Sequence, residues 1–135
     1  MIDTYTNTFI QVATDCPAVG PVVPKPKGDK KTVAQLEHEM LWEHPYEVTQ
    51  DELLFAVHMA HKGIPPERED EARKEYFSVP HACLRASPLA KTYGWGFHFD
   101  ATGKVALVPY GSEEYRKFAA DEGLQQVFAM RSKRA

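Results

Sequence analysis

The densest mixture of side chains that could do chemistry lies between His81 and His98. Within it, Ser87 followed by Pro88 is typical of the start of a short helix, where backbone N–H groups lack partners. Arg85 and Lys91 are cations beside this helix start, and they would favour a bound anion or carboxylate there. The alternative is that these cations are surface charges and that Trp95 belongs to the core. The candidate ligand-binding residues are His81, Cys83, Arg85, Ser87, Lys91, Tyr93 and His98.

Histidine and cysteine could instead form a metal site or a nucleophile. His58 and His61 are three residues apart on a predicted helix and could share a metal ion, or they could simply flank an amphipathic helix. His81 and Cys83, together with His98, could supply nitrogen and sulfur ligands to zinc, or a thiol nucleophile with an imidazole base. These spacings match no established motif, so the sequence assigns no metal, no cofactor and no catalytic residue.

The segment 16–31 carries four prolines and four lysines. A strand, glycine, lysine, threonine and helix follow one another there, as in a phosphate-binding loop, but Gly20 and Gly28 are too far apart and Asp29 interrupts the pattern. We therefore expect a Pro/Lys-rich surface loop over 16–31. The residues 131–135 form a short basic tail, for which a solvated terminus is the simplest interpretation.

Sixteen Lys and Arg residues against nineteen Asp and Glu residues give a formal net charge of −3, so we expect no nucleic acid partner. No apolar run approaches the roughly eighteen residues that cross a bilayer, and Met1–Asn7 lacks the pattern of a secretory signal. Cys16 and Cys83 lie outside any CxxC motif, which fits a reducing compartment. These features favour a cytoplasmic protein with no membrane partner.

Two capping patterns predict a pair of amphipathic helices in the middle of the chain. Thr32 begins the first, which should end before Pro45, and Thr49 begins the second, which should end at Gly63. A third helix after Pro66 is highly charged, and we expect it to be mostly solvated on the edge of the core.

Strands are predicted near both termini and in a hairpin. Thr, Phe, Ile and Val cluster over 6–13, aromatic residues alternate over 95–99, the turn at 100–103 leads into a strand to 109, and a last strand spans 124–130. A helix capped by Ser112 should precede that strand. We expect one α+β domain over 1–135, with a small antiparallel sheet covered on one face by helices; parallel βαβ winding is the alternative.

Several stretches together resemble a bacterial family of uncharacterised proteins of about 130 residues, classed as a domain of unknown function. The resemblance covers nearly the whole chain and implies an intact domain in the bacterial cytosol, with no activity or site residues to carry over. The stretches are Asn7–Ile10, Asp15–Pro17, Lys31–Ala34, His44–Tyr46, Cys83–Leu89, Tyr93–Gly96, Gly103–Leu107 and Ser112–Tyr115.

Two functional hypotheses follow from the sequence. The first is a non-catalytic module that binds a small anionic ligand or a protein partner. The second is an enzyme that uses a His/Cys metal or nucleophile site. A DNA-binding role is third, because the second helix carries only Lys62 near its end, too little charge for a recognition helix. The sequence leaves the oligomeric state open.

Overall fold

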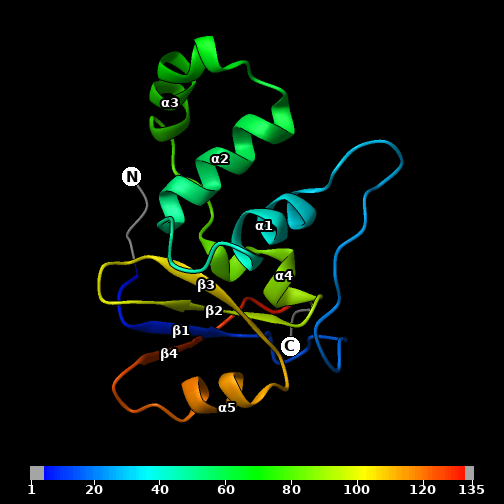
Figure 1. Ribbon diagram of the computed structural model, residues 1–135, viewed down its shortest axis with the longest axis vertical. Coiled ribbons are helices and arrows are strands. Elements are labelled where there is room, and N and C mark those ends of the chain that lie inside the picture. Colours follow the sequence, from blue (N-terminus) through cyan, green and yellow to red (C-terminus); the bar gives the residue numbers. More distant parts are fainter. Residues whose placement is uncertain (1–4, 133–135) are drawn as a thin grey trace.

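The computed structural model describes residues 5–132, and these include a four-stranded sheet in the order β3-β2-β1-β4 (Figure 1). The strands are β1 Thr8–Gln11, β2 Trp95–Phe99, β3 Val105–Pro109 and β4 Gln125–Phe128. The helices are α1 Val33–Trp42, α2 Gln50–Lys62, α3 Glu69–Phe77, α4 Pro88–Lys91 and α5 Glu113–Ala119, with single 3₁₀ turns at η1 Pro66–Arg68 and η2 Leu84–Ala86. The predicted α+β class and the predicted hairpin are confirmed, while the terminal strands and the last helix are shorter than expected.

The sheet is mixed rather than antiparallel throughout. β1 pairs antiparallel with β2, and β2 with β3, but β4 pairs parallel with β1. The reason is the connection through α5, which carries the chain from the β3 edge to the β4 edge, so that β4 runs in the same direction as β1. The prediction of a purely antiparallel sheet was wrong in this one pairing.

Helices cover both faces of the sheet, not one (Figure 1). The neighbours Phe9 and Ile10 in β1 are both fully buried, and successive strand residues point to opposite faces. Ile10 joins a core beneath α1, α2 and α4, whereas Phe9 packs with Val108 and with Tyr115 of α5. Because both faces are apolar, both need a cover, and α5 supplies the second.

The capping patterns form as predicted. The Thr32 hydroxyl accepts a hydrogen bond from the Gln35 N–H (3.1 Å), and Thr49 and Glu52 make a reciprocal capping box. The second helix ends at Gly63, whose φ of +65° suits glycine. Within residues 5–132, no helix has the length and apolar character needed to traverse a bilayer.

α3 packs on α2 at the end of the molecule away from the sheet (Figure 1). Its buried residues are Ala72 and Tyr76, and the rest of the helix is largely solvated, as its charge pattern predicted.

The 16–31 segment is a mostly exposed loop that is held at one point. The Trp95 indole N–H donates to the Val22 carbonyl (2.9 Å), and the Val22 N–H donates to the Tyr93 carbonyl (2.8 Å). At Gly94 a Cβ atom would collide with the backbone of Gly20, so glycine is required where the loop crosses. The predicted basic tail from residue 133 onwards lies outside the described residues.

Candidate functional site

The predicted site residues nearest α3 are bound to separate neighbours. His81 stacks on the Tyr76 ring at 3.7 Å between centroids, and its Nε2 lies 2.7 Å from the Tyr76 carbonyl oxygen. The Cys83 Sγ lies 3.4 Å from the Tyr5 hydroxyl. The contacts of the imidazole and of the thiol therefore lead to different parts of the chain.

Four further predicted residues, Arg85, Lys91, Tyr93 and His98, contact other parts of the molecule. The Arg85 Nε–H donates to the Phe128 carbonyl (2.7 Å) and ties η2 to β4. Lys91 is the last residue of α4, and Tyr93 packs against the core. His98 stacks on a ring of α5, on the opposite face of the sheet. The sequence neighbours between positions 81 and 98 thus do not form one cleft.

The proposed histidine pair does not gather further ligands. His58 lies beside the Tyr76 ring (4.8 Å between centroids), where burial lowers the pKa of its imidazole. His61 lies near the end of α2. Among residues 5–132, no three His, Cys, Asp or Glu side chains are grouped as a metal site requires, and Cys16 and Cys83 are free thiols.

Ser87 does begin a helix, but a carboxyl group of the protein itself lies there. Its Oγ accepts a hydrogen bond from the Leu89 N–H (3.1 Å) and donates to Oε1 of Glu37 (2.5 Å). Glu37 comes from α1 and is only 2% exposed; burial raises its pKa to about 7, although the Ser87 hydrogen bond opposes the rise. The position predicted for an external anion is therefore filled.

An open pocket of about 520 Å³ lies at the outer edge of β3, and it is lined from residues 42–46 and from residues 106–118, about sixty positions further along the chain. Trp42 and Tyr46 contribute rings from the end of α1 and the linker to α2, and Phe118 contributes a ring from α5. Ser112 and Glu114 add a hydroxyl and a carboxylate. This volume is typical of small-molecule sites, and we call it the aromatic pocket.

The backbone of Tyr46 is held in an unusual conformation. Its φ is +59°, a value that costs a bulky residue roughly 1–3 kcal/mol. The Tyr46 N–H donates to the Val105 carbonyl (3.0 Å), and the Val105 N–H donates to the Val48 carbonyl (3.0 Å). These two bonds fasten the linker along the exposed edge of β3 and hold the Tyr46 ring at the pocket wall.

A hydrogen-bonded pair supports this wall. The Tyr46 hydroxyl lies 2.7 Å from Nδ1 of His98, and the His98 ring stacks on Phe118 at 4.0 Å between centroids. Burial raises the pKa of Tyr46, and Glu114 and Asp100 raise it further, while burial lowers the pKa of His98. The phenol therefore keeps its proton and the imidazole is neutral; in the Nε2-protonated tautomer of His98, the Tyr46 O–H donates a hydrogen bond to Nδ1.

Part of the β3 backbone also faces the aromatic pocket. The Asp100 N–H donates to the Lys104 carbonyl. The backbone groups of the even-numbered residues of β3 therefore bond to β2, and those of the odd-numbered residues face the outer edge of the sheet. The outward groups of Val105 are used by the linker. Leu107, two residues on, directs its N–H and C=O to the same edge and lines the pocket.

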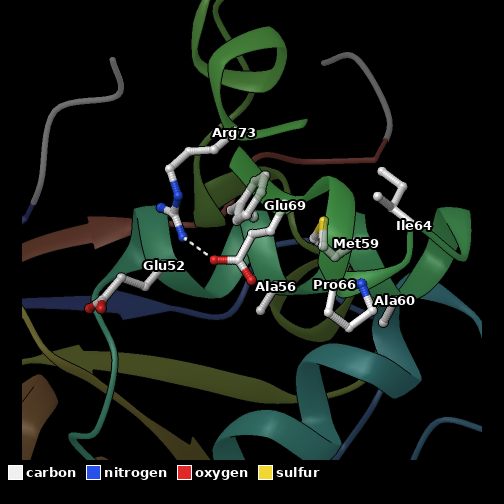
Figure 2. Close-up of a pocket in the computed structure, with 9 residues that line it drawn as sticks. Glu52, Ala56, Met59, Ala60, Ile64, Pro66, Glu69 and Arg73 are labelled. Carbon is white, nitrogen blue, oxygen red and sulfur yellow. Dashed lines mark hydrogen bonds and ion pairs between the residues drawn. The ribbon is translucent and has the colours of Figure 1, made fainter. Parts of the chain in front are cut away.

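A second depression, of about 430 Å³, lies between α2 and α3 (Figure 2). Figure 2 shows Arg73 and Glu69 directed toward each other above an apolar floor that includes Met59. Arg73 donates to Glu69 (3.3 Å) and lies 4.5 Å above the Phe55 ring centroid. Arg73 and Glu69 are thus paired with each other, and Glu52, also in the lining, accepts a hydrogen bond from the Thr49 N–H (2.9 Å), which leaves the aromatic pocket as the better candidate.

The sequence named His98 as a candidate residue but named neither Tyr46 nor Glu37. Glu37 carried a usable signal, because it lies four residues after Val33 and four before Leu41, on the buried stripe of α1. Tyr46 carried none, because its position depends on pairing with a strand about sixty residues later.

Comparisons with curated proteins and with solved structures gave no match. A family model matches residues 1–135, and the resemblance described from the sequence covers nearly the same span. The chain therefore belongs to the family of unknown function DUF6157.

Proposed function

We propose that this protein is a non-catalytic module that binds a small organic ligand in the aromatic pocket. The observation that carries the proposal is the convergence of Trp42 and Tyr46, from the end of α1 and the linker after it, with Phe118 of α5 on one open pocket. Trp42 remains 45% exposed, although tryptophan gains much from burial. A ligand between these rings would bury that surface.

The protonation states around the pocket support binding rather than catalysis. A general base or nucleophile needs a pKa near the working pH, but burial raises the pKa of Tyr46 above its ordinary value near 10. The pKa of His98 is lowered by burial, and its Nδ1 is engaged by the Tyr46 hydroxyl. Both groups act as fixed, uncharged hydrogen-bonding partners.

We also propose that the protein works in the cytoplasm. Both Cys16 and Cys83 are free and only partly buried, a state that a reducing compartment maintains.

A small anion is a second candidate ligand, at a different place. A depression of about 360 Å³ is lined by Lys30, Lys31, His61 and Lys62, from the 16–31 loop and the end of α2. Lys31 is paired with Glu39 (2.9 Å), so the other two lysines would supply the attraction. Titration with pyrophosphate tests this candidate: binding that the double substitution Lys30→Gln with Lys62→Gln abolishes supports it, and no binding at low salt removes it.

The main proposal is tested by a ligand-observed NMR screen of small aromatic, aliphatic and charged compounds against the full chain. Compounds that bind should lose at least about fivefold in affinity in Trp42→Ala, since one stacked ring contributes on the order of 1 kcal/mol. Tyr110→Ala is the matched control, because this half-exposed ring lies outside the pocket lining.

Trp42 also contacts Trp95 (5.0 Å between centroids), so circular dichroism must show that Trp42→Ala is folded. Tyr46→Gly provides a second variant that removes a pocket ring. A screen without binders, or binders insensitive to both substitutions, contradicts the proposed function.

A further inference from the structure

The walls of the aromatic pocket carry partial negative charge. Trp42, Tyr46 and Phe118 line it, and an aromatic ring attracts cations toward its face, although one face of Phe118 is already stacked on His98. In the Nε2-protonated tautomer of His98, the Tyr46 O–H donates a hydrogen bond to Nδ1, so the phenol oxygen keeps its lone pairs available as acceptors. The aromatic rings and the phenol oxygen thus both favour a ligand with positive charge.

The formal charges around the pocket have the same sign. Glu114 is the acidic residue among those that line it, and within residues 5–132 the lining contains no lysine or arginine. Asp100 and Glu114 both act on the Tyr46 hydroxyl. A ligand with positive charge would therefore be attracted, and a carboxylate or phosphate would be repelled.

The start of α5 is the one feature that opposes a cation, because a helix N-terminus carries partial positive charge. Here the Ser112 hydroxyl accepts a hydrogen bond from the Tyr115 N–H (3.0 Å), and two acidic residues occupy the first turn. A full carboxylate charge on Glu114 exceeds the roughly half charge of a helix end.

We propose that the aromatic pocket binds a small organic cation, with an alkylated ammonium group against Trp42, Tyr46 and Phe118 and its charge balanced by Glu114. This inference rests on the proposed function, since it names the chemical class of the ligand in the same pocket. Alkyl groups matter because they fill the space between rings and because an alkylated ammonium is weakly hydrated. A metal ion fits poorly, because Ca²⁺ takes six to eight oxygen ligands and the lining offers a single carboxylate.

The test compares choline with 3,3-dimethylbutan-1-ol, a neutral molecule of nearly the same shape in which carbon replaces the ammonium nitrogen. Isothermal titration calorimetry on the full chain should give an affinity for choline at least about tenfold higher than for the alcohol. Glu114→Gln should reduce this ratio at least about threefold. Glu113→Gln, an exposed neighbour on the same helix, should leave the ratio within about twofold.

The outcomes separate the inference from the proposed function. If the alcohol binds as tightly as choline and Trp42→Ala weakens both, the pocket binds ligands but the inferred positive charge is wrong. If choline binds equally well to wild type, Trp42→Ala and Glu114→Gln, the inferred site is wrong. If neither compound binds while other compounds bind the pocket in the NMR screen, the inference fails and the proposed function stands.

Discussion

Two hydrogen-bonded pairs lie on opposite faces of the sheet, and they differ in what surrounds them. Glu37 and Ser87 join α1 to the start of α4 and are both almost fully buried. Tyr46 and His98 join the α1–α2 linker to β2 and are only partly buried, beside an open pocket. In the first pair, the Glu37 carboxyl group of the protein itself lies at the start of α4, where an external anion would otherwise bind.

This difference shows that residue types alone do not identify a site. A serine at a helix start beside basic residues suggests anion binding, yet Ser87 serves to fix the packing of α4 on α1. A tyrosine in a linker suggests little, yet Tyr46 is held in a strained conformation at a pocket wall. We therefore expect changes at the first pair to act on stability and changes at the second to act on binding.

The largest expected effect is a pH dependence of stability that comes from Glu37. Its pKa is about 7 in the folded chain and 4.5 for a free carboxyl group. Between these values the unfolded chain has lost the proton that the folded chain retains, so stability falls as pH rises, by about 3 kcal/mol in total. Urea unfolding at pH 5 and pH 8 should show this loss.

Glu37→Gln should remove most of that loss, because glutamine does not titrate. The slope that remains should be small, because Asp51, whose pKa burial raises, and His58 and His98, whose pKa burial lowers, act in opposite directions. Glu39→Gln, an exposed neighbour on α1, is the control and should behave like wild type. An unchanged pH dependence in Glu37→Gln would show that this carboxyl group is not the source.

The next effect separates two serine caps. Ser87→Ala should cost about 2 kcal/mol, because it removes the cap of Leu89 N–H and leaves the Glu37 carboxyl group without its donor. Ser112→Ala removes a comparable cap from α5 at a half-exposed position and should cost about 1 kcal/mol. Denaturant midpoints measure the loss of stability in both variants. Equal losses would contradict the conclusion that burial of the Glu37–Ser87 pair makes its hydrogen bonds more costly to remove.

A smaller stability effect is expected for Tyr46→Gly, with a larger effect on binding. Glycine relieves the cost of a φ of +59°, roughly 1–3 kcal/mol, while the lost ring contacts act in the opposite direction. The unfolding free energy should change by less than about 1 kcal/mol, whereas ligand affinity should drop. A large loss of stability with unchanged affinity would mean that Tyr46 is structural.

The smallest effect concerns the imidazole of His98. Burial holds its pKa below the ordinary value of 6.5, and in the Nε2-protonated tautomer a hydrogen bond from the Tyr46 O–H to Nδ1 would also favour the neutral ring. Tyr46→Phe should therefore raise the pKa of His98, by under about one unit. Following the His98 ring signals by NMR during a pH titration measures it, and a fall in pKa would contradict the assigned direction of the hydrogen bond.

Local signals in the sequence predicted most elements of the fold. Capping residues such as Thr49 act on atoms three residues away, so helix starts can be read from short windows. The parallel pairing of β4 could not be predicted in this way, because the four-residue strand of Gln125–Phe128 carries no information about the direction of its partner. The second covered face was indicated in the sequence by consecutive apolar residues, Phe9 and Ile10 in β1 and residues 105–108 in β3.

The candidate site was less accessible to prediction. The run from 81 to 98 concentrates reactive side chains along the chain, but turns and a change of sheet face separate them in space. The aromatic pocket assembles from two short segments, Trp42 with Tyr46 and Glu114 with Phe118, and the roughly seventy positions between these segments exceed the range of any local pattern. His98 was found because of its type, while its role depends on Tyr46.

The most direct test of the contrast between the two pairs is a ¹H–¹⁵N NMR titration of the full chain with choline. The predicted result is a saturable shift of the amide signals of Trp42, Tyr46, Glu114 and Phe118, with those of Glu37, Ser87 and Leu89 unchanged. Shifts centred on Ser87 and Leu89, or no saturable shift at the aromatic pocket, would contradict it.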